Sequence, residues 1–152
     1  ILDDEGSHNL KPCIPESATF SILPVRDVIP LIGNVKFMFR LLVYIFKLKR
    51  IKEAVFFSIV DVLQPKIIIT QIDASHIMGR IHAEFPDKLT ISVQNGFRTG
   101  PKYSDNSYSR LPVSLFYCFG EHDEMKMKSM EIKHEEFVAA GSLVYGLYKK
   151  KL

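Results

Sequence analysis

The sequence predicts an α/β protein with a Rossmann-like, three-layer αβα domain and a mainly parallel sheet. Residues 66–72 form an apolar, largely β-branched run, which is typical of a parallel strand buried on both faces. Strand patterns alternate with helix patterns along the chain, as βαβ units require. Several strand patterns end abruptly in polar or small residues, as expected where strands carry a site at the carboxyl edge of a sheet.

Size and composition fit one ordinary domain. The chain has 152 residues, of which 47% are hydrophobic and 24% charged. The net charge of +3 is mild, and no dense basic patch is interleaved with aromatic residues, so we expect no nucleic-acid partner. The two cysteines, Cys13 and Cys118, make a poor disulfide framework, which favours the cytoplasm.

The sequence motifs exclude several classes of site. The histidines are not spaced as metal ligands, so we expect no metal site. The sequence has no GxSxG, GxGxxG or GxxxxGK[ST] motif. These absences disfavour a serine hydrolase, a dinucleotide-binding protein and a P-loop enzyme.

The first elements are short. Residues 1–2 are expected to end a strand, and Ser7 is expected to cap a helix that reaches about Lys11. Residues 19–24 predict a second short strand, closed by Pro24. Because the chain starts without Met and partway into a strand pattern, we expect it to be a piece of a longer protein.

Residues 31–48 predict a long apolar helix. Its charged residues, Lys36, Arg40 and Lys47, form one narrow stripe on a helical wheel. A packed core helix is the favoured interpretation. A helix on a membrane surface is the second, which would place the protein at the inner face of the membrane, and a membrane span is the third.

The remaining elements follow in alternation. Residues 51–63 predict an amphipathic helix that Gln64-Pro65 ends. The later strands are expected at residues 66–72, 89–93, 113–119 and 135–140, and the later helices at residues 75–85 and 121–130. Residues 99–112 predict a polar surface loop.

Polar or small residues follow four of these strands, and parallel strands bring such residues to one edge. The candidate substrate-binding residues are Ser75, Gln94, Asn95, Gly96, Arg98, Gly120, Gly141 and Ser142, and the candidate catalytic residues are Asp73 and Glu121. A carboxylate at this edge can act as a general base, and an arginine can bind a phosphate or a carboxylate. Each residue also has a structural alternative, such as a helix cap, a turn or an ion pair.

An ordered set of segments resembles a known family. The segments are Gln64-Pro65-Lys66-Ile67-Ile68-Ile69-Thr70, Ile72-Asp73, Ile91-Ser92-Val93-Gln94-Asn95-Gly96-Phe97-Arg98, Phe119-Gly120-Glu121-His122-Asp123 and Ala140-Gly141-Ser142-Leu143. This set, over residues 55–148, resembles bacterial surface-carbohydrate biosynthesis proteins. These are similar to the N-terminal half of GT-B glycosyltransferases and to the glycerophosphate transferases of teichoic-acid synthesis.

The resemblance implies a glycosyltransferase in cell-surface polysaccharide biosynthesis, of which this chain is the acceptor-side domain. Residues 1–148 would form that Rossmann-like domain, and residues 149–152 would begin a linker to a C-terminal donor domain that this chain lacks. The partners implied are a carbohydrate or lipid-linked glycan acceptor and the missing donor domain. No cofactor is expected here, whereas the full-length protein is expected to use a nucleotide-sugar donor.

The alternative is a non-catalytic α/β domain that binds a sugar, a nucleotide or an anion at the same edge. One departure from the family bears on this choice. Some related transferases carry a histidine before the strand-end glycine, where this sequence has Asn95. Because an amide does not accept a proton at neutral pH, the base would be Asp73 or Glu121.

Overall fold

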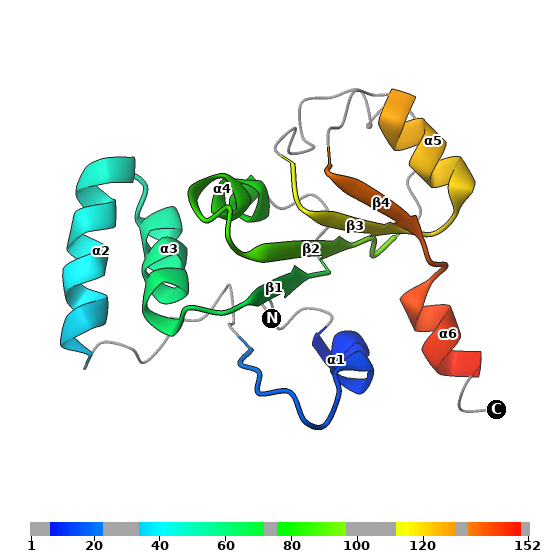
Figure 1. Cartoon of the computed structure of the whole chain (residues 1–152), viewed down its shortest axis with the longest axis horizontal. Coiled ribbons are helices and arrows are strands. Elements are labelled where there is room, and N and C mark those ends of the chain that lie inside the picture. The colour runs from blue at the N-terminus through cyan, green and yellow to red at the C-terminus, as the bar shows by residue number, and fades with distance from the viewer. Residues whose placement is uncertain (1–6, 23–33, 72–75, 97–111, 130–133, 150–152) are drawn as a thin grey trace. The chain divides into compact units, whose positions relative to one another are not determined.

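The structure, a computed structural model, describes residues 7–22, 34–71, 76–96, 112–129 and 134–149 (Figure 1). The chain divides into two compact units. One, here the sheet unit, comprises residues 1–25 and 67–152, and the other, the helical unit, comprises residues 26–66.

The helical unit contains two packed helices, α2 (Val35–Leu48) and α3 (Ile51–Leu63). Asn34 caps α2, because its side-chain oxygen accepts a hydrogen bond from the Phe37 amide at 3.1 Å. At the end of α3, Gln64 adopts a left-handed conformation (φ 47°), which stops the helix before Pro65, as predicted.

Polar and aromatic contacts join the two helices. The Tyr44 ring meets the Phe57 ring edge-on, with ring centroids 5.5 Å apart. Arg40 Nε lies 3.0 Å from Asp61 Oδ2, and the Tyr44 hydroxyl donates to the same oxygen at 3.5 Å. These contacts place Arg40 and Tyr44 on the side of α2 that faces α3.

The prediction that residues 31–48 form a packed core helix is wrong for the outer face of α2. Of its fourteen residues only Phe37 and Tyr44 are buried. Six large apolar side chains on the same helix are exposed, and they are considered further below. None of the helices in the described parts of the chain is long and apolar enough to cross a bilayer.

The sheet unit confirms the α/β, Rossmann-like fold with a parallel sheet. Its strands, β1 (Ile67–Thr70), β2 (Leu89–Val93), β3 (Leu115–Cys118) and β4 (Glu136–Ala139), lie in chain order, and each pair is parallel. Ile91 pairs with Leu115, and Phe116 with Phe137. Strand order does not reverse among these four strands.

Two crossover helices, α4 (His76–Glu84) and α5 (Glu121–Ser129), lie on the same side of the sheet (Figure 1). Right-handed crossovers between strands in sequential order require this arrangement. Side-chain contacts agree: His82 of α4 reaches Thr90, and Lys128 of α5 lies over the Phe137 ring at 5.6 Å. This face of the sheet is buried, with Thr90, Ser92, Phe116 and Cys118 almost fully covered.

The elements near the ends of the chain differ in part from the prediction. The short helix is present as α1 (Ser7–Leu10), with Ser7 as its first residue, and it continues as a 3-10 turn, Lys11–Cys13. The strand predicted at residues 19–24 is wrong, because residues 19–22 form no strand. Helix α6 (Leu143–Lys149) was not predicted. The strand expected at residues 1–2 and nearly all of the loop at 99–112 lie outside the described residues.

Candidate functional site

The carboxyl ends of β1 to β4 lie along one edge of the sheet, here the carboxyl edge, because all four strands are parallel. This arrangement brings the predicted residues 94–96, 120–121 and 141–142 to the same edge. Asp73, Ser75 and Arg98 fall outside the described residues.

Gln94 lies directly after β2 and joins it to the end of β3. Its side chain is buried, its Oε1 accepts a hydrogen bond from the Phe119 amide at 3.0 Å, and its Nε2 donates to the Gly96 carbonyl at 3.1 Å. Its own amide donates to the Tyr117 carbonyl. Gln94 therefore fixes the shape of the edge, while its exposed neighbour Asn95 presents a side chain to solvent.

Gly120 and Glu121 form the start of α5. The Gly120 carbonyl accepts a hydrogen bond from the Glu124 amide at 3.1 Å, so Gly120 occupies the cap position. Glu121 is exposed at the first position of the helix, where the macrodipole favours a carboxylate. An exposed carboxylate at this place is accessible to a ligand.

Gly141 and Ser142 form the start of α6. Gly141 has a positive φ of 84°, a conformation in which glycine avoids the steric cost of a side chain. The Ser142 hydroxyl accepts a hydrogen bond from the Tyr145 amide at 3.3 Å, and the Ser142 carbonyl accepts one from the Gly146 amide. Ser142 is therefore the N-cap of α6, which gives this serine a structural role at the edge.

Gln71, the first residue after β1, was missed in the sequence. It is 5% exposed, and its side-chain oxygen Oε1 has no hydrogen-bond partner among the described residues. Buried polar atoms nearly always have a partner, so such an atom calls for a specific explanation. A signal was available, because β1 and β2 are each followed directly by glutamine, in Ile69-Thr70-Gln71 and Ser92-Val93-Gln94.

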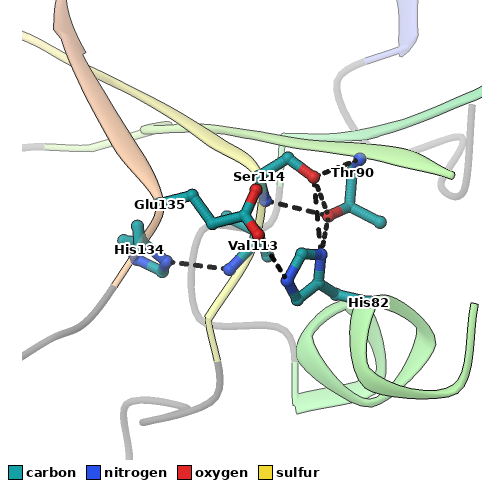
Figure 2. Close-up of polar contacts among 6 residues, drawn as sticks. All are labelled: His82, Thr90, Val113, Ser114, His134 and Glu135. Carbon is teal, nitrogen blue, oxygen red and sulfur yellow. Dashed lines mark hydrogen bonds and ion pairs between the residues drawn. The ribbon is translucent and has the colours of Figure 1, made fainter. Parts of the chain in front are cut away.

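A second polar cluster lies at the opposite, amino edge of the sheet (Figure 2). Thr90 Oγ1 accepts a hydrogen bond from the Ser114 amide at 3.0 Å, and Ser114 Oγ accepts one from the Thr90 amide at 3.2 Å. His82 Nδ1 lies 3.0 Å from Thr90 Oγ1 and 3.4 Å from Ser114 Oγ. The two hydroxyls thus extend the pairing of β2 and β3 by one residue ahead of Ile91 and Leu115, the first paired residues.

His134 and Glu135, which directly precede β4, complete this cluster. Glu135 Oε1 lies 3.5 Å from His82 Nε2, on the far side of the imidazole from the hydroxyls. His134 Nδ1 accepts a hydrogen bond from the Val113 amide at 3.2 Å, and its ring stacks on Phe116 with centroids 4.7 Å apart. Burial, reinforced by the nearby His82, lowers the pKa of His134 from 6.5 to about 4, so His134 is neutral at neutral pH.

The order carboxylate, imidazole, hydroxyl in this cluster is that of a nucleophilic triad. However, Thr90 and Ser114 are buried, and each hydroxyl already accepts a hydrogen bond from the amide of the other residue. A nucleophile needs an exposed hydroxyl with room for a substrate carbonyl. The amino-edge cluster therefore acts as a structural joint between β2, β3 and α4.

The described residues offer no group of three or more His, Cys, Asp or Glu side chains placed to hold a metal ion. Neither cysteine forms a disulfide, and burial raises the pKa of the Cys118 thiol. Comparisons with protein-family models, with curated proteins and with solved structures give no match.

Proposed function

We propose that the sheet unit binds a carbohydrate at its carboxyl edge, as the acceptor-side domain of a glycosyltransferase for bacterial cell-surface polysaccharide. The observation that carries the proposal is the buried Gln71 Oε1, which has no hydrogen-bond partner in the part of the chain that the structure describes, together with a carboxyl edge shaped by Gln94. The ordered resemblance to surface-carbohydrate biosynthesis proteins supplies the reaction class.

The chemistry of this edge suits sugar hydroxyls. A hydroxyl is both a donor and an acceptor, so it pairs well with amides and carboxylates. Gln71 Oε1 offers an acceptor, Asn95 offers an exposed amide, and Glu121 offers an exposed carboxylate. In the proposed enzyme Glu121 or Asp73 takes the proton from the acceptor hydroxyl, because Asn95 does not act as a base.

Isothermal titration of this chain tests the proposal, with chitobiose as the saccharide probe and UDP-N-acetylglucosamine as the nucleotide probe. An acceptor-side domain binds the saccharide and has little affinity for the nucleotide. The control variant is Asp87→Asn, which alters an exposed side chain before β2, at the opposite edge of the sheet from the proposed contacts. Tight nucleotide binding by this chain, or saccharide binding that Gln71→Leu leaves unchanged, would overturn the assignment.

Catalysis is tested separately in the full-length protein. Glu121→Gln removes the charge and keeps the size of the side chain. If Glu121 is the base, turnover with a sugar nucleotide falls by about 10²-fold or more, while saccharide binding persists. Unchanged turnover in both Glu121→Gln and Asp73→Asn would show that neither carboxylate is the base and would favour a domain that only binds.

A further inference from the structure

Helix α2 exposes a continuous apolar face. Its exposed large apolar residues are Val35, Met38, Phe39, Leu42, Val43 and Phe46. With Val35 at 0° and about 100° per residue, Phe39, Leu42 and Phe46 fall within about 40° of it. The buried residues Phe37 and Tyr44 lie at about 180–200°, so the exposed face points away from α3.

The exposure is large at the centre and the end of this face. Phe39 is 63% exposed and Phe46 is 81% exposed. Phenylalanine side chains are usually buried, and a row of them along fourteen residues is more than scattered surface apolarity. The face therefore needs an apolar environment to cover it.

Cationic residues border this face on one side. Lys36, Arg40 and Lys47 lie at about 100–140° on the same wheel, and Lys36 and Lys47 are exposed. Lys49 and Lys52 follow directly and are also exposed. The border therefore carries exposed lysines near both ends of the helix.

The acidic residues described in the helical unit are held by arginines. Arg50 Nη1 lies 3.1 Å from Glu53 Oε1, and Arg40 Nε lies 3.0 Å from Asp61 Oδ2. The exposed lysines therefore dominate the electrostatic potential near α2.

Charge is also segregated between the units. Residues 26–66 carry eight Lys and Arg against three Asp and Glu, a net charge of +5. The rest of the chain carries twelve against fourteen, a net charge of −2. The mild total of +3 therefore conceals a strongly basic helical unit.

We propose that α2 docks on the surface of an anionic lipid bilayer. Its apolar face enters the boundary between headgroups and acyl chains, and the lysine border contacts the anionic headgroups. Charge complementarity selects this occupant over a second copy, because an antiparallel copy of α2 would bring the two cationic borders together. This interaction is independent of carbohydrate binding at the carboxyl edge.

Vesicle co-sedimentation tests the proposal with this chain. Wild type is expected to bind vesicles of phosphatidylcholine mixed with phosphatidylglycerol, and to bind less as salt is added. Binding to phosphatidylcholine alone is expected to be at least about tenfold weaker, since each lysine near an anionic surface adds attraction. Far-ultraviolet circular dichroism verifies that each variant is folded.

Two double variants separate the apolar and the electrostatic contributions. Phe39→Gln with Phe46→Gln is expected to lower binding to the mixed vesicles at least about tenfold. Lys36→Glu with Lys47→Glu is expected to lower it by a similar factor, and only on anionic vesicles. Met125→Gln removes an equally exposed apolar side chain, 63%, from the sheet unit, so it should bind like wild type.

Several outcomes would overturn the proposal. The proposal fails if wild type does not bind anionic vesicles, if it binds both vesicle types equally, or if the phenylalanine variant binds as well as wild type. Dimerisation in light scattering that the phenylalanine variant abolishes, without vesicle binding, would assign the face to a second copy instead.

Discussion

Acidification should destabilise the sheet unit through His134. The neutral ring accepts a hydrogen bond from the Val113 amide at Nδ1 and stacks on Phe116. A protonated imidazole has no acceptor atom, so the bond to Val113 cannot form in that state. Protonation of His134 is therefore less favourable in the folded chain than in the unfolded chain, as the lowered pKa of His134 indicates.

The sign and size of the effect follow from this pKa. In the unfolded chain His134 takes up a proton near pH 6.5, whereas in the folded chain it does so near pH 4. Between these values the unfolded state binds more protons, so the free energy of unfolding rises with pH. At about 1.4 kcal/mol per pH unit, His134 contributes at most about 3.5 kcal/mol of stability near neutral pH, which is lost as the pH falls through about 4.

Urea unfolding across this pH range measures the effect, with His134→Gln as the test variant. Glutamine keeps an acceptor for the Val113 amide and does not titrate. The variant should therefore show a flatter dependence of the unfolding free energy on pH between 4 and 6.5. The matched control is His122→Gln, which removes an exposed histidine at the surface of α5 and should retain the slope of wild type.

The reasoning is refuted if His134→Gln keeps the full pH slope of wild type. It is also refuted if the unfolding free energy of wild type is constant between pH 4 and 6.5. A slope of opposite sign would mean that His134 gains a proton on folding, which contradicts its burial.

Three substitutions test the other contacts by urea unfolding. Gln71→Leu removes a buried oxygen that has no partner among the described residues, so it should stabilise the protein by about 1 kcal/mol while weakening saccharide binding. A loss of stability would mean that the oxygen is hydrogen-bonded in the native state. Gln94→Ala removes the acceptor of the Phe119 amide and should cost about 2 kcal/mol, and a cost near zero would refute its role in shaping the edge. Thr90→Val removes the acceptor of the Ser114 amide and should cost about 1–3 kcal/mol, whereas an unchanged midpoint would contradict the structural joint.

The strands of the sheet were predictable because their signal is local. Ile67, Ile68 and Ile69 form a β-branched run that favours a strand, and βαβ alternation with right-handed crossovers fixes the rest. The expected burial on both faces was wrong for β1, because only Ile68 of the three is buried and Ile67 is 50% exposed. The position of the carboxyl edge follows from the same alternation. Elements without such a signal were missed: α6 depends on a cap by Ser142, which also fits a simple turn.

The polar clusters were less predictable because they depend on register. His82 reaches Ser114 across 32 residues, and this contact exists only because Ile91 pairs with Leu115. Likewise, the outer face of α2 was assigned to the core because apolar residues surround most of the helix in sequence. Periodicity alone does not predict whether another part of the protein covers that face, because this depends on tertiary packing.

Carbohydrate binding at the carboxyl edge is tested most directly by nuclear magnetic resonance of the labelled chain during titration with chitobiose. The account predicts shifts of the side-chain amide signals of Gln71 and Asn95, with the backbone amides of Thr90 and Ser114 at the amino edge unchanged. Shifts confined to the amino edge, or no shifts at saturating saccharide, would contradict it.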